Sequence, residues 1–187
     1  MMKTDFSCVG NKSRRQFIKL AGLSTALLTF GSVAKKTIAQ SNSQYYTIEQ
    51  QFSGKYICSG DTENGGNIWF WGPIPNGHES RYKFELIDTG DGYHYLKHQF
   101  SGKYICSGHT ENGGKLWLYG PIPDGHEARY KFELIDKGDG YHYLRHQFSG
   151  KYICSGETEN GGKLWLYGPI PDGHEARYKF QLSPVSA

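Results

Sequence analysis

The chain has 187 residues, of which 37% are hydrophobic and 15% aromatic. That length is enough for one domain with a buried core. Residues 1–39 hold seven of the 21 Lys and Arg and one of the 18 Asp and Glu. Residues 40–187 therefore carry 14 positive against 17 negative side chains, although the full chain has a net charge of +3. Without a Lys and Arg cluster to neutralise phosphates, no nucleic-acid partner is expected.

The first segment has the order of an export signal. Arg14 and Arg15 are followed by a mildly apolar stretch, Leu20 to Val33, and by small residues near Ala39 that suit a cleavage site. The paired arginines before Phe and Lys resemble the bacterial twin-arginine motif. We therefore expect residues 1–39 to be a twin-arginine signal peptide of a periplasmic or secreted protein. An uncut anchor is the alternative, but the apolar run is shorter than the roughly 20 residues of a spanning helix. We expect no membrane span in the mature protein.

The rest of the chain consists of three tandem copies of one unit. The segment QFSGKYICSG begins at Gln51, Gln99 and Gln147, which gives a constant period of 48 residues. Self-similarity at a fixed period of about 20–50 residues indicates one supersecondary unit copied several times. We expect a single domain, residues 40–187, whose copies are residues 45–92, 93–140 and 141–187.

Each copy contains four stretches suited to short β-strands. They are rich in Tyr, Ile, Leu, Trp and Phe, which favour a pleated half-buried surface, and turn-forming residues separate them. In the second copy the expected strands are Tyr93–His98, Lys103–Ser107, Lys115–Tyr119 and Tyr130–Ile135. A propeller needs at least about four blades, whereas a closed three-fold barrel removes the edges that an open sheet would expose. The pattern therefore favours an all-β barrel.

Alternation along these strands assigns side chains to two faces. Trp117 and Tyr119 should point outward, where an indole is a candidate for stacking on the apolar face of a sugar ring. A local mini-core under the Gly-Pro-Ile-Pro turn is the alternative. The equivalent pairs are Trp69 with Trp71 and Trp165 with Tyr167. The side chains expected in the core of the second copy are Leu96, Leu116, Leu118, Phe132 and Leu134.

Several motifs of the repeat resemble those of the β-trefoil lectins. The pattern is similar to the ricin-type one, although the Gln-x-Trp of that family is absent, and it is closer to the mussel galactose-binding β-trefoil lectins. The matching motifs of the second copy are Lys97-His98, Ser101-Gly102-Lys103, Lys115–Leu118 and Asp124–Glu127. The resemblance covers residues 45–183. It implies a β-trefoil of three 48-residue repeats with four short strands each, and a multivalent lectin for galactose- or GalNAc-type glycans, with neither catalysis nor a cofactor.

The resemblance also points to a sugar site at the Asp-Gly-His-Glu turn. In the mussel lectins the matching Asp and His contact galactose, which implies that role for Asp124 and His126. A carboxylate accepts, and an imidazole donates or accepts, hydrogen bonds with adjacent hydroxyls. An ordinary Pro-Asp-Gly turn without a ligand is the alternative. The full set of candidate sugar-binding residues is Asn76, His78, Trp69, Asp124, His126, Trp117, Asp172, His174 and Trp165.

The chain departs from the mussel pattern in two ways. Asn76 replaces the aspartate in the first copy, which should make that site the weakest, because a charged acceptor makes the stronger hydrogen bonds. The mussel motif His-Pro-x-Gly-Gly is replaced by Cys106-Ser107-Gly108, so the histidine that would complete the sugar contacts is absent. Glu111 or Asn112 of the next loop are possible substitutes.

Two other functions stay open from the residues alone. A protein-binding or inhibitory β-trefoil would use the same loops without a sugar. A glycan-acting enzyme, which is less favoured, would use Glu111, Asp124 and Glu127 as paired carboxylates. Three copies of one site are typical of binding through avidity, so we expect no enzyme.

Histidines and cysteines raise the question of a metal site. His94 and His98 share a strand face, a spacing that suits zinc, but a bond from the histidine to the Ser-Gly-Lys turn is favoured. Cys58, Cys106 and Cys154 occupy equivalent places in the three copies. Such positions tend to lie too far apart for a disulfide. We expect three small, inert, half-buried thiols rather than a three-thiolate metal site.

Overall fold

The computed structural model describes residues 44–186. The first repeat contains β1 (Tyr45–Gln50), β2 (Tyr56–Cys58), β3 (Gly66–Asn67), β4 (Trp69–Trp71), the 3-10 helix η1 (Glu79–Arg81) and β5 (Lys83–Asp88). The second contains β6 (His94–His98), β7 (Tyr104–Cys106), β8 (Gly114–Lys115), β9 (Trp117–Tyr119), η2 (Glu127–Arg129) and β10 (Lys131–Asp136). The third contains β11 (His142–His146), β12 (Tyr152–Cys154), β13 (Gly162–Lys163), β14 (Trp165–Tyr167), η3 (Glu175–Arg177) and β15 (Lys179–Val185).

The expected signal peptide, with Arg14 and Arg15, lies outside these described residues. Within residues 44–186 no helix has the length and apolar character needed to cross a bilayer.

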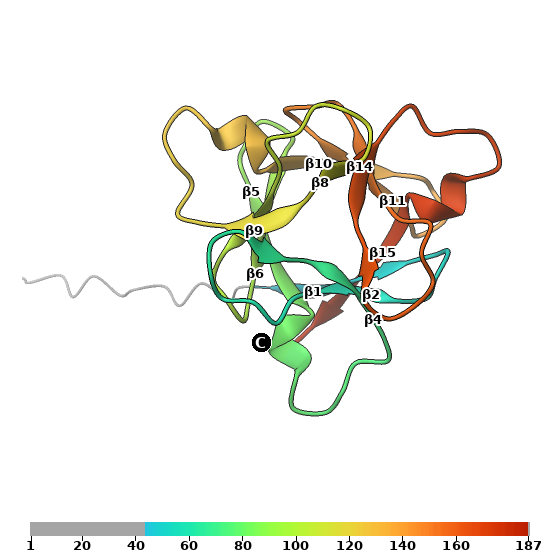
Figure 1. The fold of residues 1–187 in the computed structure, drawn as a ribbon, viewed down its shortest axis with the longest axis horizontal. Coiled ribbons are helices and arrows are strands. Elements are labelled where there is room, and N and C mark those ends of the chain that lie inside the picture. Colours follow the sequence, from blue (N-terminus) through green and yellow to red (C-terminus); the bar gives the residue numbers. More distant parts are fainter. Residues whose placement is uncertain (1–43, 187) are drawn as a thin grey trace, which may run out of the picture. The chain divides into compact units, whose positions relative to one another are not determined.

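Six strands close into a barrel. Strand β1 pairs with β15 and β5, β5 pairs with β6, β6 with β10, β10 with β11, and β11 with β15, all antiparallel. The sequence of pairings returns to β1, so the barrel offers no free edge to another chain. Figure 1 shows the three repeats arranged around this barrel, each with its 3-10 helix on a separate outer lobe. The predicted closed three-fold barrel is confirmed.

The hairpins of the three repeats form a second ring. Each hairpin pairs internally, as β2 with β4, β7 with β9, and β12 with β14. Each is joined to another through β3 with β9, β8 with β14, and β13 with β4. The predicted third strand is therefore interrupted after its first residue. In the second repeat the chain changes its pairing partner at Leu116, whose side chain is buried in the core.

A loop asparagine fastens each hairpin to another repeat. Its Oδ1 accepts a hydrogen bond from a backbone amide in the Gly-Pro turn. The bonds join Asn64 to Gly120 at 3.1 Å, Asn112 to Gly168 at 3.0 Å and Asn160 to Gly72 at 3.0 Å. The carbonyl oxygen of Asn112, considered above as a sugar contact, is thus engaged in holding two repeats together.

The core is built from five sets of three equivalent side chains. Fully burying each one stabilises the fold by about 1.5–3 kcal/mol. The sets are Ile48, Leu96 and Leu144; Phe84, Phe132 and Phe180; Ile57, Ile105 and Ile153; Phe70, Leu118 and Leu166; and Ile68, Leu116 and Leu164. The expected core residues of the second copy are all buried except Leu134, which is partly buried and packs against this cluster.

Buried polar side chains link the barrel to the loops. His98 donates from Nε2 to the carbonyl oxygen of Arg81 at 2.9 Å, which leaves Nδ1 to accept from the hydroxyl of Ser101, also at 2.9 Å. His146 makes the equivalent contacts, and burial lowers the pKa of both imidazoles. The predicted bond to the Ser-Gly-Lys turn is confirmed, and both ring nitrogens of His98 are occupied. In residues 44–186 no group of three or more potential ligand side chains is placed to hold a metal ion.

Candidate functional site: one cavity in each repeat

Each repeat forms a cavity between its hairpin and its 3-10 helix. In the second repeat β7 and the residues after it supply Cys106, Ser107 and Gly108, β9 supplies Trp117 and Tyr119, and the region around η2 supplies Pro123, His126, Arg129 and Tyr130. Equivalent residues line the cavities of the first and third repeats. The cavity volumes are about 280, 250 and 430 Å³ in chain order. The third is also lined by Gly113 of the second repeat.

One wall of each cavity is aromatic because of the strand pleat. Trp117 and Tyr119 share the outer face of β9, while Leu118 between them is fully buried. The indole is half-buried and the phenol is 38% exposed. The prediction that both rings point away from the core is confirmed. The same division occurs in β4 and β14.

The loop that carries His126 is held by local hydrogen bonds. Gly125 adopts a φ of 77°, a backbone conformation that favours glycine. Its amide donates to Glu127 Oε1 at 3.0 Å. Hydrogen bonds from the backbone amides of Glu127 itself and of Gly125 hold the pKa of the Glu127 carboxyl below its usual range. Glu127 therefore stabilises the turn as an ionised acceptor, which is not the state of a general acid.

The carboxylate of Glu111 is also engaged locally. It pairs with Nδ1 of His109 and accepts from the amide of Thr110 at 3.1 Å. The bond to His109 is the main reason that the pKa of Glu111 is lowered. Neither Glu111 nor Glu127 lines the cavity.

A thiol and a phenol form the back of the cavity. The side chains of Cys106 and Tyr130 interact with one another, and burial raises the pKa of each to about 12. Both groups are therefore neutral near pH 7, and the thiol is a poor nucleophile. Cys58, Cys106 and Cys154 are free and belong to three different cavities. They are buried rather than half-buried as predicted.

The sequence reasoning missed an arginine in each cavity. In the second repeat Arg129 follows His126 by three residues, and its guanidinium carbon lies 5.1 Å from the ring centroid of Phe148 in the next repeat. Arg81 over Phe100 and Arg177 over Phe52 have the same geometry. The signal that was available is the motif Gly-His-Glu-x-Arg-Tyr, which is present in all three copies.

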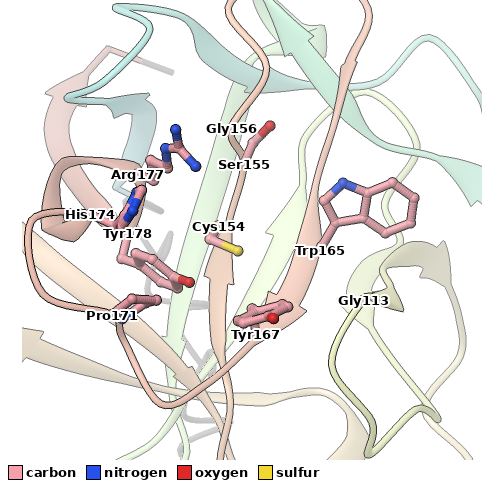
Figure 2. Close-up of a pocket in the computed structure, with 10 residues that line it drawn as sticks. All are labelled: Gly113, Cys154, Ser155, Gly156, Trp165, Tyr167, Pro171, His174, Arg177 and Tyr178. Atoms are coloured by element: carbon pink, nitrogen blue, oxygen red, sulfur yellow. The ribbon is translucent and has the colours of Figure 1, made fainter.

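Figure 2 shows the third cavity. Trp165 and Tyr167 come from β14 on one side, and Arg177 and Tyr178 come from the other side, with Cys154 between them. A side chain at Gly156 would approach the guanidinium, because a Cβ there would lie 3.3 Å from an Arg177 nitrogen.

The structure brings together some of the predicted site residues and leaves others apart. The predicted Trp and His of each repeat line the same cavity: Trp69 with His78, Trp117 with His126, and Trp165 with His174. The three residues at the start of the turn, Asn76, Asp124 and Asp172, are exposed and are not among the lining residues. A sugar held against the aromatic wall would reach them only by extending beyond the cavity.

No protein-family model and no curated protein sequence matches the chain. Several solved structures share its fold. The designed three-fold symmetric protein ThreeFoil is 26% identical, with a TM-score of 0.65 over 74% of this chain and 96% of ThreeFoil. An exo-β-1,3-galactanase from Clostridium thermocellum is 24% identical, with a TM-score of 0.67 over 78% of this chain and 31% of the enzyme.

A lectin from Polyporus squamosus, solved with the glycan epitope Neu5Acα2-6Galβ1-4GlcNAc, is 12% identical, with a TM-score of 0.62 over 75% of this chain and 49% of the lectin. The chain thus spans about a third of the galactanase and about half of this lectin. The closed barrel, the ring of three hairpins and these similarities agree on one conclusion: the chain has the β-trefoil fold, which lectins and parts of glycosidases share.

Proposed function

We propose that the protein is a multivalent lectin that binds one sugar residue in each of its three cavities. The observation that carries this proposal is the threefold recurrence of an aromatic wall facing an imidazole and a guanidinium. A flat ring stacks on the apolar face of a pyranose, while His and Arg supply hydrogen bonds to its hydroxyls. Two of the three cavities are slightly smaller than the range of about 300–1,000 Å³ for ligand pockets, and the third lies in its lower part. Cavities of this size suit one monosaccharide rather than a longer stretch of a glycan chain.

Galactose- or GalNAc-type residues are the proposed ligands. The resemblance of the Lys-His, Ser-Gly-Lys and Asp-Gly-His-Glu motifs to those of the mussel lectins supports this choice. So does general sugar chemistry, because the axial 4-hydroxyl of galactose leaves one face of the ring continuously apolar. Trp69, Trp117 and Trp165 would stack on that face.

Three weak sites on one rigid domain favour binding to glycan-coated surfaces. Linked binding events increase apparent affinity by about 10²–10⁴-fold when the geometry permits them together. A glycan array probed with residues 40–187 should show retention on galactose- or GalNAc-terminated glycans, and free galactose at millimolar concentration should displace the protein. Retention that no free sugar reduces would instead support a protein-binding β-trefoil.

Catalysis is a second candidate function, because some proteins of similar structure are glycosidases. The trefoil covers only about a third of the galactanase, and Glu111 and Glu127 are held in local hydrogen bonds. We propose that this chain binds glycans without cleaving them. Release of sugar from a labelled galactan by the purified protein would overturn this.

Export is a separate proposal that rests on the sequence alone. The twin-arginine motif at Arg14 and Arg15 should direct the protein to the periplasm or beyond. Changing both residues to Lys should leave the protein in the cytoplasm, as measured by fractionation and immunoblotting. Normal export of this variant would contradict the proposal.

A further inference from the structure

We propose that the three cavities select acidic sugars, with the carboxylate or sulfate group of the ligand held by Arg81, Arg129 and Arg177. This inference rests on the proposed sugar binding and adds the charge of the ligand. It follows from how these arginines are placed and from the bonds that they do not make within residues 44–186.

The first observation is that the three guanidinium groups lack an anionic partner. Within residues 44–186 none of them forms an ion pair or donates a side-chain hydrogen bond. The ion pairs of this region join Lys97 to Glu85, His109 to Glu111, Lys131 to Asp91, Arg145 to Glu133 and Lys179 to Asp139. A guanidinium is always charged near neutral pH and offers five N–H donors. The cavities thus hold three permanent cations with unused donors.

The second observation is that each of these arginines is held in place. The ring of Phe148 lies under the guanidinium of Arg129 at 5.1 Å. The backbone carbonyl of Arg129 accepts from Nε2 of His146 at 2.9 Å and from the amide of Ser107 at 3.0 Å. This cation–π contact uses none of the N–H donors at the edge of the guanidinium, and these donors have no hydrogen-bond partner within residues 44–186. Little conformational entropy is therefore lost when an anion binds.

The third observation concerns the direction of that edge. A Cβ built on Gly60, Gly108 or Gly156 would lie 3.6, 3.8 or 3.3 Å from the nearest guanidinium nitrogen. Since glycine has no side chain, this edge is not covered and forms part of the cavity wall. The indole stands on the other side of the cavity (Figure 2). A sugar stacked on the indole would direct one substituent at the guanidinium, and a carboxylate or sulfate there makes two parallel, charge-assisted hydrogen bonds.

The residue that follows Gly60, Gly108 or Gly156 in the sequence differs among the three cavities. It is Asp61 in the first repeat, His109 in the second and Glu157 in the third. Asp61 accepts from the amide of Asn67 at 2.8 Å, and Glu157 accepts from the amide of Lys163 at 2.9 Å, so each adds a negative charge beside its cavity. His109 instead packs edge-on against Trp117, with ring centroids 5.5 Å apart. The second cavity should therefore bind an acidic sugar most tightly.

Isothermal titration of residues 40–187 with galactose, galacturonic acid and galactose 6-sulfate tests the proposal. Hydrogen bonds to a charged partner contribute more than neutral ones, so at least one acidic sugar should bind about tenfold more tightly than galactose at low salt. The preference for the acidic sugar over galactose should become smaller as the sodium chloride concentration is raised. The two acidic ligands show whether a carboxylate or a sulfate ester is the better fit.

Substitutions assign the preference to the cavities. The triple variant Arg81→Gln, Arg129→Gln and Arg177→Gln should bind galactose and galacturonic acid alike. The matched control is Arg145→Gln, which removes one charge from an arginine already paired with Glu133 and should leave the preference intact. If the triple variant unfolds, His109→Glu provides the test without touching an arginine. It copies Glu157 of the third repeat and should lower affinity for the acidic sugar in the second cavity by more than it lowers affinity for galactose.

The two proposals fail in different ways. Equal affinity of the parent protein for galactose and both acidic sugars would overturn the acidic-sugar inference and leave the lectin proposal standing. An unchanged preference in the triple Gln variant, or in His109→Glu, would likewise overturn the inference. An absence of binding to every sugar, with a blank glycan array, would overturn the lectin proposal itself.

Discussion

The first repeat and the other two share a backbone frame but differ at a few informative positions. Inside the fold, Phe70 stands where the others have Leu118 and Leu166, and its ring stacks on Phe180 with centroids 6.2 Å apart. Gln50 stands where the others have His98 and His146. Its Nε2 donates to the carbonyls of Arg177 and Ser155 at 2.7 and 3.0 Å. Interior positions therefore differ between repeats where the surrounding packing or hydrogen bonding suits a different side chain.

Around the cavities the first repeat differs at a few positions, most of them exposed. The first repeat has Trp71 in place of a tyrosine, Asn76 in place of an aspartate, and Asp61 at the position held by His109 in the second repeat. The tryptophan, thiol, arginine and tyrosine of the inner walls are the same in all three cavities. The comparison separates a shared binding surface from a variable edge.

The largest expected effect concerns the core. Leu118→Ala should destabilise the protein by about 2–5 kcal/mol, because it leaves a cavity in the ring of hairpins. Leu118→Phe copies the first repeat, but the surrounding residues of the second repeat are packed for leucine. It should cost about 1–3 kcal/mol through overpacking. Denaturant unfolding measures both. A neutral Leu118→Phe would show that the repeats are interchangeable in the core.

The next effect concerns the shared aromatic wall. Trp117→Ala combined with Trp165→Ala should weaken binding to a glycan-coated surface by about 30-fold or more, as for a central aromatic contact. The melting temperature should fall by only part of what a fully buried indole would cost, because both indoles are half-buried. The control is Tyr93→Ala, which removes a partly buried ring that lines none of the three cavities. A double Trp variant that still binds as the parent does would exclude these cavities as the sugar sites.

A smaller effect concerns the buried histidines and pH. Burial lowers the pKa of His98 and His146 in the folded state, so the unfolded chain takes up protons first as the pH falls. Their stabilising contribution is complete above the unfolded pKa of about 6.5 and is lost as the pH falls toward the folded pKa. The melting temperature should therefore drop between pH 7 and pH 5.

Gln50 supplies the control for this pH effect. The variant His98→Gln with His146→Gln copies the first repeat, keeps a donor to the arginine carbonyl and removes the titration. Most of the drop in melting temperature between pH 7 and pH 5 should disappear. A drop as large as in the parent would mean that other groups cause it.

The smallest expected effect concerns the variable edge. Asp124→Asn with Asp172→Asn makes the second and third turns like the first. Losing a charged acceptor costs on the order of 1 kcal/mol, or about fivefold in affinity, where the acceptor touches the sugar. Because both carboxylates are exposed and lie outside the cavity lining, we expect a loss no greater than this by isothermal titration. A complete loss of binding would place the sugar at the turn instead of in the cavity.

The period of 48 residues and the alternation of side chains predicted the barrel and most of its core, although Ile105 was not among the expected core residues. They also predicted that Trp117 points outward and that His98 bonds to the Ser-Gly-Lys turn. Both follow from the order of residues within one repeat. The interruption at Leu116 was not predictable, because it depends on pairing with another repeat. Arg129 was missed for a related reason: its position over Phe148 exists only once the repeats are closed in a ring.

The central claim is that each cavity binds one sugar, and the stoichiometry of binding tests it most directly. Titration of residues 40–187 with the tightest-binding monosaccharide should give three sugars per chain. The variant Trp117→Ala with Trp165→Ala, which leaves only the first cavity intact, should give one sugar per chain with the fold preserved. A single sugar per parent chain, or a stoichiometry that the double variant leaves unchanged, would contradict the account.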